Sequence, residues 1–361
     1  MSSLPFGVVM LLALLVSAVI SFGTTPLVKK MAYKIGAIDV PKDGRRMHKK
    51  PIPRLGGLAI ALAFLLTVLL FAELNQQIRG ILLGAIIIVV LGVLDDCLAL
   101  KASFKFVVQI LAAVVVVCHG CTIRYLSNPL IGSDTQYLDL GNWSIAITII
   151  WIVAITNAVN FIDGLDGLAV GVSAISAATL LVIALLVGEG AIAVVLTALL
   201  GACLGFLPYN FNPAKIFMGD TGSTFLGFIL ACLSIQGMFK LYAVISFAVP
   251  FLILGVPIFD ICFAVIRRLA RHQSPMQADR GHIHHRLIDM GFSQKQAVAI
   301  TYMITAMLGL AAVVLTSSGE ARALILIGSI FVVGAIGLGV IFGKNHTEPE
   351  ESEERKDEVQ E

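Results

Sequence analysis

Residues 144–167, SIAITIIWIVAITNAVNFIDGLDG, join an apolar run to a polar end. The first part carries no charge and approaches the roughly 20 apolar residues that a helix needs to cross a bilayer core. Four polar residues then recur at every third position, and the first three of them share one face of a helix. These four are Asn157, Asn160, Asp163 and Asp166. The stretch therefore predicts a membrane-spanning helix with a polar mouth.

The composition of the whole chain is that of a membrane protein. Over 361 residues it is 58% hydrophobic and 13% charged, whereas about a quarter of the residues in soluble domains are charged. We therefore expect an all-α integral membrane protein, a polytopic bundle of about 11 transmembrane helices. The expected spans are residues 4–25, 56–72, 79–94, 104–120, 144–160, 168–187, 190–207, 222–238, 241–266, 297–316 and 322–342.

The spans are expected to form a single transmembrane domain over residues 1–343. The acidic segment that follows, residues 344–361, lacks apolar periodicity and is predicted to be a disordered tail. Residues 121–143 alternate apolar and polar residues around a group of turn residues, which predicts a small β-hairpin.

The basic residues are distributed unevenly between the two sides of the membrane. All but four of the 25 lysines and arginines fall in loops on one side, the exceptions being Arg79, Arg124, Lys240 and Arg322. Because cytoplasmic loops carry the excess of basic residues, the N-terminus is predicted to lie outside and the C-terminus in the cytoplasm. The β-hairpin is then extracytoplasmic.

The acidic and histidine-rich clusters all fall on the cytoplasmic side of this topology. They are residues 95–96, 157–167, 208–223 and 280–286. An aspartate at the bilayer midplane costs about 2.5 to 3.5 kcal/mol on insertion scales, and a place at the mouth of a helix avoids most of that cost. We therefore expect one functional site at the cytoplasmic face.

The carboxylates in two of these clusters favour a function over a structural role. Asp95 and Asp96 end a predicted helix, where negative charge opposes the helix macrodipole, although a solvated loop start is the alternative. In the polar mouth at 157–167, hydrogen bonds between helices explain the asparagines better than the aspartates.

The segment FMGDTGS, residues 217–223, predicts a cation site. Asp220 and Thr221 stand at the expected N-cap of the span 222–238, and the free N–H groups of a helix N-terminus favour an anion. A carboxylate beside an anion site is explained if a divalent cation joins the two, and Mg²⁺ binds one or two carboxylates together with phosphate oxygens. A capping aspartate alone is the alternative.

The histidines of RGHIHHR, residues 280–286, stand between two arginines. Cations so close to His282, His284 and His285 favour a phosphate or sugar partner over a zinc site. Asp260 lies inside the expected span 241–266 and is a further candidate, with a partner that the sequence does not identify.

Five motifs together resemble those of the polyprenyl-phosphate N-acetylhexosamine-1-phosphate transferases, in the same order over about residues 25 to 300. They are HKKPIPRLGG at 48–57, GVLDDCLALK at 92–101, NAVNFIDGLDGLA at 157–169, NPAKIFMGDTGS at 212–223 and RGHIHHRL at 280–287. The resemblance implies a multi-span inner-membrane enzyme with its active site at the cytoplasmic face. Such enzymes move a sugar-1-phosphate from a UDP-sugar to a polyprenyl phosphate, use Mg²⁺ or Mn²⁺, and release UMP.

The resemblance also implies a role for individual residues. Asp220 matches the principal Mg²⁺ ligand and Asn160 a second metal contact. Asp95 and Asp96 match paired aspartates, one of which acts as base or nucleophile, and Lys49 matches a lysine near the phosphates. The substrate-binding candidates are Phe217 stacked on uracil, Asp166 near the base, the site-lining Asn210, and Asn157 and Asp163 of the polar mouth. The loop that recognises the donor sugar matches Arg280, His282, His284 and His285.

Within the family, HxHHRL and PIPRLGG are similar to the branch that uses UDP-GlcNAc. That branch initiates cell-envelope polymers such as teichoic acid or the O-antigen of lipopolysaccharide, so the expected partners are UDP-GlcNAc, undecaprenyl phosphate and membrane lipids, and no nucleic acid. The branch that transfers phospho-MurNAc-pentapeptide is the second reading. It has three successive histidines, where this chain has His-Ile-His-His. The oligomeric state is left open between a monomer and a homodimer.

Two other classes of protein are alternatives. A nucleotide-sugar or anion transporter holds its polar site near the midplane, often between internal repeats, which this sequence lacks. The CDP-alcohol phosphotransferases have a motif similar to DGLDG. Their motif also contains an alanine-arginine pair and a later aspartate pair, which are absent here. For a transferase, a one-step displacement is favoured over a covalent intermediate, because a phosphate monoester is already largely anionic at neutral pH.

Overall fold

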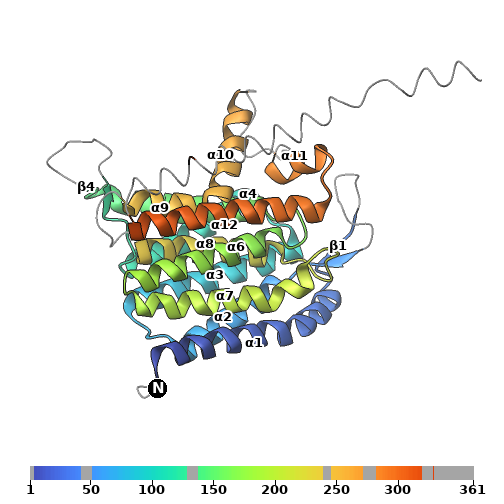
Figure 1. Ribbon diagram of the computed structural model, residues 1–361. Coiled ribbons are helices and arrows are strands. Elements are labelled where there is room, and N and C mark those ends of the chain that lie inside the picture. Colours follow the sequence, from blue (N-terminus) through green and yellow to red (C-terminus); the bar gives the residue numbers. More distant parts are fainter. Residues whose placement is uncertain are drawn as a thin grey trace, which may run out of the picture.

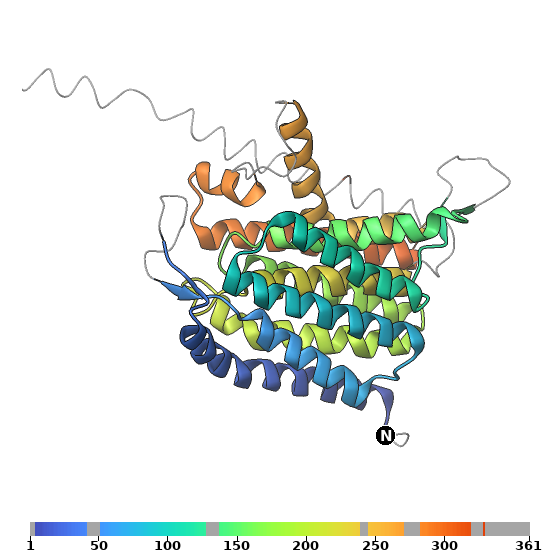
Figure 2. The ribbon, with the colours of Figure 1, turned by 180° about the vertical axis from the view of Figure 1, so that it is seen from behind.

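Long helices run side by side across the molecule, so that their ends form two opposite faces (Figures 1 and 2). The computed structural model describes residues 4–41, 51–127, 137–238, 245–270 and 282–318, together with residue 328. The helices are α1 Phe6–Ile35, α2 Gly57–Phe71, α3 Gln76–Leu98, α4 Ala102–Cys118, α5 Trp143–Phe161, α6 Leu168–Leu186, α7 Gly190–Asn210, α8 Gly219–Met238, α9 Ile245–Ile253, α10 Gly255–Ala270, α11 Ile283–Asp289 and α12 Gln294–Ser318. The strands are β1 Ile38–Asp39, β2 Ile52–Pro53, β3 Tyr125–Ser127 and β4 Tyr137–Asp139.

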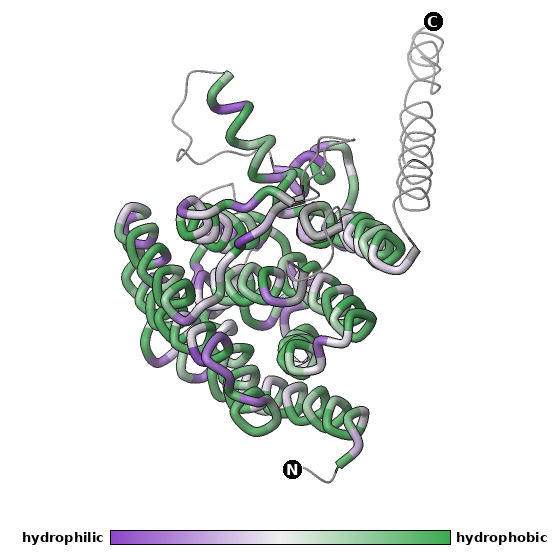
Figure 3. The backbone as a smooth tube through the Cα atoms, turned by 90° about the vertical axis from the view of Figure 1, so that its left-hand side faces the viewer, coloured by the Kyte–Doolittle hydropathy of each residue, from purple (hydrophilic) through white to green (hydrophobic). Residues whose placement is uncertain are grey.

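The fold is that of a multi-pass membrane protein. Within the described residues, six helices are long and apolar enough to cross a membrane, namely α1, α3, α5, α6, α7 and α12. Figure 3, which views the molecule from one side of Figure 1, shows the helical bundle to be mostly hydrophobic. The all-α membrane fold is thus confirmed, while the number of about 11 spans stays a prediction. The expected span 322–342 and the tail 344–361 lie outside the described residues, apart from residue 328.

Helix α8 packs most closely against α2, α3, α5 and α6. Lipid tails are as apolar as leucine side chains, so helices in a membrane associate through close packing, often at small residues. A Cβ atom on Gly57 of α2 would meet the backbone of Gly222 at 2.0 Å, and one on Gly92 of α3 would meet Thr221 Cα at 2.3 Å. These two glycines therefore let α2 and α3 approach the start of α8.

The expected span at 241–266, in which Pro250 and Pro257 predict kinks, is not one continuous helix, because the structure divides it into α9 and α10. Pro257 lies in the first turn of α10, where a residue without an N–H group is tolerated and where a continuous helix would lose a hydrogen bond. Helix α10 then leaves the bundle at a steep angle, as Figures 1 and 2 show.

Two pairs of short strands lie at the ends of the bundle. Strands β3 and β4 pair antiparallel, with Leu126 opposite Leu138, in the segment where the sequence predicts a hairpin. Strands β1 and β2 pair antiparallel at the opposite end (Figure 1). The side of the membrane on which each pair lies stays a prediction.

Candidate active site

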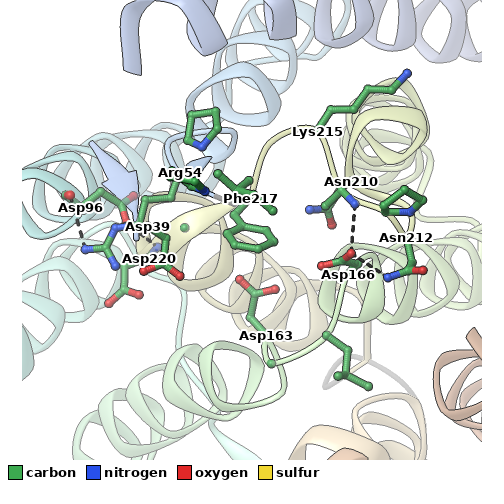
Figure 4. Close-up of a pocket in the computed structure, with 18 of the residues that line it drawn as sticks. Asp39, Arg54, Asp96, Asp163, Asp166, Asn210, Asn212, Lys215, Phe217 and Asp220 are labelled. Carbon is green, nitrogen blue, oxygen red and sulfur yellow. Dashed lines mark hydrogen bonds and ion pairs between the residues drawn. The ribbon is translucent and has the colours of Figure 1, made fainter. Parts of the chain in front are cut away.

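A pocket of about 830 Å³ opens where α3 and α5 end and α8 begins. Figure 4 shows the ring of Phe217 among the residues that line it. The predicted site residues that line the pocket are Asp96, Asn160, Asp163, Asp166, Asn210, Phe217, Asp220 and His285. Asp95, Asn157, His282 and His284 are not among its lining residues. Lys49 and Arg280 lie outside the described residues.

The Asp96 carboxylate binds the first turn of α8. Its Oδ1 accepts the backbone N–H of Asp220 at 3.0 Å, and its Oδ2 accepts the N–H of Thr221 at 3.1 Å and the Thr221 hydroxyl at 2.6 Å. A negative charge at a helix N-terminus is stabilised by the helix dipole. Asp96, which is 4% exposed, therefore acts as the cap of a helix that lies more than a hundred residues later.

This capping corrects the expected position of Asp220. Helix α8 begins at Gly219, so Asp220 and Thr221 lie inside its first turn rather than at its N-cap. Gly219 has φ +70°, a left-handed conformation that favours glycine, and a Cβ atom there would meet Asp96 Oδ2 at 2.5 Å. Because Asp96 supplies the cap, the Asp220 carboxylate is left to face the pocket.

Lys105 joins the carboxylates of Asp95 and Asp220. Its Nζ lies 2.8 Å from Asp95 Oδ2 and 2.8 Å from Asp220 Oδ2, while Asp95 Oδ1 accepts the N–H of Leu100 at 2.8 Å. Lys105 is not among the site residues expected from the sequence. The sequence does mark it, because an ionisable residue inside an apolar run is a functional candidate. Lys105 lies just inside the apolar run of α4, as Asp260 lies inside another.

The residues around Asp220 fit a divalent cation of the Mg²⁺ type. Asn160 lies beside the Asp220 carboxylate, and its Nδ2 donates to Ser223 Oγ at 2.7 Å, so its amide oxygen is the atom available as a ligand. Within the described residues no three His, Cys, Asp or Glu side chains form a closed metal cage. Mg²⁺ does not need one, because it keeps several waters and takes substrate phosphate oxygens as ligands.

Asp166 and Asn210 hold the segment that connects α7 to α8. Asp166 Oδ2 accepts Asn212 Nδ2 at 2.9 Å and the N–H of Ala214 at 3.0 Å. Asn210 Oδ1 accepts the N–H of Gly167 at 3.1 Å, and its Nδ2 donates to a backbone carbonyl of the same segment. Both side chains thus fix the wall of the pocket as well as line it (Figure 4).

The backbone of Phe217 ties two of the five motifs together. Its N–H donates to Pro53 O at 2.8 Å, and its carbonyl accepts the N–H of Gly56 at 2.9 Å. This contact brings Arg54 beside Asp96, with 3.7 Å between Arg54 Nε and Asp96 Oδ1. In the sequence Arg54 stands in the motif HKKPIPRLGG without an assigned role, and the structure adds it to the pocket lining.

Asp163 is half-buried and directs its carboxylate into the pocket (Figure 4). Burial, and then the charges of Asp220, Asp96 and Asp166, raise its pKa to about 8. These negative neighbours disfavour the charged form of the Asp163 carboxyl group. A nearby cation would favour that charged form. The pocket therefore concentrates acidic groups that a bound cation can stabilise.

The three histidines of the RGHIHHR motif have different surroundings. His285 lines the pocket. His282 Nδ1 lies 2.7 Å from Asp260 Oδ2, which identifies the partner of Asp260 that the sequence could not name. His284 packs against Gly164, and burial together with its histidine neighbours lowers its pKa to about 3, so that it is neutral at neutral pH.

Asn157 makes contacts between helices. Its Nδ2 donates to Gln109 Oε1 of α4 at 2.7 Å and to Val153 O at 2.8 Å. The bond to Gln109 is an interhelical hydrogen bond, the structural role that the sequence left open for the asparagines, whereas Val153 belongs to the same helix, α5.

The chain has relatives of known name. The sequence model of glycosyl transferase family 4 matches residues 78–238. Over 307 residues, 85% of each chain, the sequence is 43% identical to the probable undecaprenyl-phosphate N-acetylglucosaminyl 1-phosphate transferase of Bacillus subtilis (strain 168). The chain belongs to the polyprenyl-phosphate N-acetylglucosamine-1-phosphate transferases. The family resemblance inferred from the motifs is thereby confirmed.

Other members of this transferase family are more distant. A decaprenyl-phosphate N-acetylglucosaminephosphotransferase of Mycobacterium tuberculosis (strain CDC 1551 / Oshkosh) is 35% identical over 353 residues, 90% of this chain and 87% of the relative. The undecaprenyl-phosphate alpha-N-acetylglucosaminyl 1-phosphate transferase of Escherichia coli (strain K12) is 28% identical over 284 residues, 78% and 77% of the two chains. The family match at 78–238 contains Asp95, Lys105, Asn160 and Asp220 of this transferase.

Proposed function

We propose that the pocket transfers GlcNAc-1-phosphate from UDP-GlcNAc to a polyprenyl phosphate, giving polyprenyl-pyrophosphoryl-GlcNAc and UMP. The observation that carries this proposal is the Asp220 carboxylate, which faces the pocket at the start of α8 while Asp96 caps that helix. The names of the relatives support the same reaction. The acceptor is undecaprenyl phosphate by analogy with the Bacillus relative.

The substrates are placed by charge and shape. Phe217 offers its ring to the uracil, and Asp163 and Asp166 lie on the wall beside it. The pyrophosphate lies near Asp220, where Arg54, beside Asp96, supplies positive charge. His285 faces the donor sugar. Lys49 and Arg280 remain proposed contacts to phosphate and sugar.

The reaction is an in-line displacement at phosphorus. An oxygen of the lipid phosphate forms a bond to the β-phosphorus of the donor, and the bond from that phosphorus to the bridging oxygen breaks, so that UMP leaves with the electron pair. When bound at Asp220 and Asn160, Mg²⁺ or Mn²⁺ neutralises charge on the pyrophosphate oxygens. The residues of the chain orient the two phosphates and exclude other geometries.

Asp96 is assigned a positioning role in this mechanism. Both of its oxygens accept hydrogen bonds from α8, so neither is directed at the lipid phosphate. The acceptor does not require a base, because the second pKa of a phosphate monoester is about 6 and the attacking oxygen is already anionic. We therefore propose a one-step transfer without a covalent aspartyl intermediate.

The site is proposed to face the cytoplasm of a bacterial inner membrane, with the N-terminus outside, and to start a cell-envelope glycopolymer. The excess of basic residues in the loops on that side supports this orientation. The pocket lies at the ends of α3, α5 and α8, whereas a transporter site is expected near the middle of the bundle.

The test is a donor panel with purified protein. Undecaprenyl phosphate, Mg²⁺ and one UDP-sugar at a time are supplied, and UMP and the lipid-linked product are both measured. Release of UMP in equal amount to the lipid product, with UDP-GlcNAc as the preferred donor, supports the proposal. Preference for the MurNAc-pentapeptide donor, or movement of label across vesicles without UMP release, contradicts it.

A further inference from the structure

A buried carboxylate on α10 holds the start of α11. Asp260 is 2% exposed, and both of its oxygens have partners. Oδ2 lies 2.7 Å from His282 Nδ1, and Oδ1 accepts the backbone N–H of Ile283 at 2.7 Å. A buried carboxylate that lost these donors would be costly, so the two contacts fix α11 to α10.

The contacts continue from His282 to the wall of the pocket. The rings of His282 and His284 are stacked, with 5.7 Å between their centroids and 5° between their planes. The ring centroids of His284 and His285 are 4.4 Å apart. A Cβ atom on Gly164 would meet His284 Nε2 at 2.2 Å, so His284 lies directly against the backbone of Gly164. Gly164 and His285 both line the pocket. The buried end of this chain of contacts is Asp260.

Helix α10 has two different faces. Its outer face exposes large apolar side chains, with Phe259 56%, Phe263 58% and Ile266 65% exposed. Its inner side packs against α5 and α12, and Asp260 lies on this side. The helix otherwise stands apart from the bundle (Figures 1 and 2). Asp260 therefore links a peripheral helix to the pocket.

We propose that Asp260 is a positioning residue for the transfer reaction. By binding His282 and the backbone of Ile283, it holds His284 against Gly164 and His285 at the pocket wall. It touches neither substrate. The inference rests on the proposed binding of UDP-GlcNAc in this pocket, with the donor sugar facing His285.

The kinetic test compares four variants of the full-length protein, Asp260→Ala, His282→Ala, the double variant and Asp260→Asn. We expect the KM for UDP-GlcNAc to rise in Asp260→Ala by about 10- to 100-fold, the range found for groups that orient metal-binding histidines. The KM for undecaprenyl phosphate should stay unchanged. The double variant should lose no more than Asp260→Ala, because the two residues act in one chain of contacts that leads to His284.

Two variants serve as comparisons. Asp260→Asn retains an oxygen that can accept the Ile283 N–H, so it should recover part of the KM loss of Asp260→Ala. Asp289→Asn removes an exposed carboxylate from α11, the helix that Asp260 holds, and should leave the KM values for both substrates unchanged. Additive losses in the double variant, or a lower melting temperature with an unchanged donor KM, overturn the proposal.

A measurement without turnover separates this inference from the proposed function. Hydrogen exchange of the backbone amides of residues 283–289 should become faster in Asp260→Ala than in the wild type and Asp289→Asn. If the wild type released no UMP but this exchange increased, the proposed function would fail and the contact would stand. Unchanged exchange together with an unchanged donor KM would refute the role of Asp260 itself.

Discussion

Thr221 donates two hydrogen bonds to the Asp96 carboxylate, one from its backbone N–H at 3.1 Å and one from Oγ1 at 2.6 Å. The contact joins the C-terminal end of α3 to the N-terminal end of α8, and it places Asp220 at the pocket. An aspartate that the sequence offered as base or nucleophile thus has the contacts of a helix cap.

Replacing Asp96 should affect stability as well as activity. Loss of an N-cap side chain costs about 0.5 to 2 kcal/mol, so Asp96→Ala should melt at a lower temperature than the wild type. Asp96→Asn keeps one acceptor oxygen, so its melting temperature should lie between those of the wild type and Asp96→Ala. Thermal unfolding in one detergent measures the order. An Asp96→Ala protein that is as stable as the wild type but inactive would instead indicate a catalytic base.

Lys105 should be required for transfer through its charge. Its ammonium group joins Asp95 to Asp220, and Lys105→Met leaves these carboxylates without that cation. Its two contacts hold the Asp220 carboxylate in place, and loss of a group that orients a site residue typically costs about 10- to 100-fold in activity, so we expect kcat to fall by about that factor. Lys101→Met is the matched control, because Lys101 is exposed at the start of the same helix. Equal rates for the two variants would remove Lys105 from the site.

The close approach of α2 to α8 should not tolerate a side chain. Gly57→Ala places a Cβ atom 2.0 Å from the backbone of Gly222, and backbone cannot turn aside as a side chain can. Overpacking of this kind typically costs about 1 to 3 kcal/mol. Gly23→Ala in α1 is the control, since nothing lies within 4 Å of its added Cβ atom. The yield of folded protein and its melting temperature should fall for Gly57→Ala alone, and equal values would contradict the packing.

His284 should make stability depend on pH. Its folded pKa of about 3 lies below the unfolded value near 6.5, so the unfolded state binds the extra proton between these values. Stability should therefore fall as the pH is lowered from about 7 toward 4. His284→Gln lacks this proton and should show a flatter profile. Melting temperatures across that pH range measure the difference, and parallel profiles would show that His284 is charged in the folded state.

The helices could be predicted because each depends on its own stretch of sequence. The apolar runs at 56–72 and 144–160 became α2 and α5 almost at the expected bounds. The break between α9 and α10 could not be located, because Pro250 and Pro257 both permit a kinked helix and packing decides where it ends.

The partners of the site residues were harder to predict than their positions. Motifs in the sequence indicated Asp96 and Asp220 as polar groups at one end of the bundle, and Asp260 was a candidate because it is an ionisable residue in an apolar span. What each carboxylate binds depends on residues brought together by the fold, such as Thr221 for Asp96 and His282 for Asp260. Lys105 was missed because a single lysine in an apolar run has no motif to mark it.

The central claim is that Asp220 holds the divalent cation and the donor pyrophosphate in the pocket. The most direct measurement titrates Mn²⁺ into wild-type protein and Asp220→Asn, follows bound Mn²⁺ by electron paramagnetic resonance with UDP-GlcNAc present, and records UMP release in the same samples. We predict that the wild type binds Mn²⁺ and releases UMP, whereas folded Asp220→Asn does neither. Undiminished Mn²⁺ binding and turnover in Asp220→Asn would contradict the account.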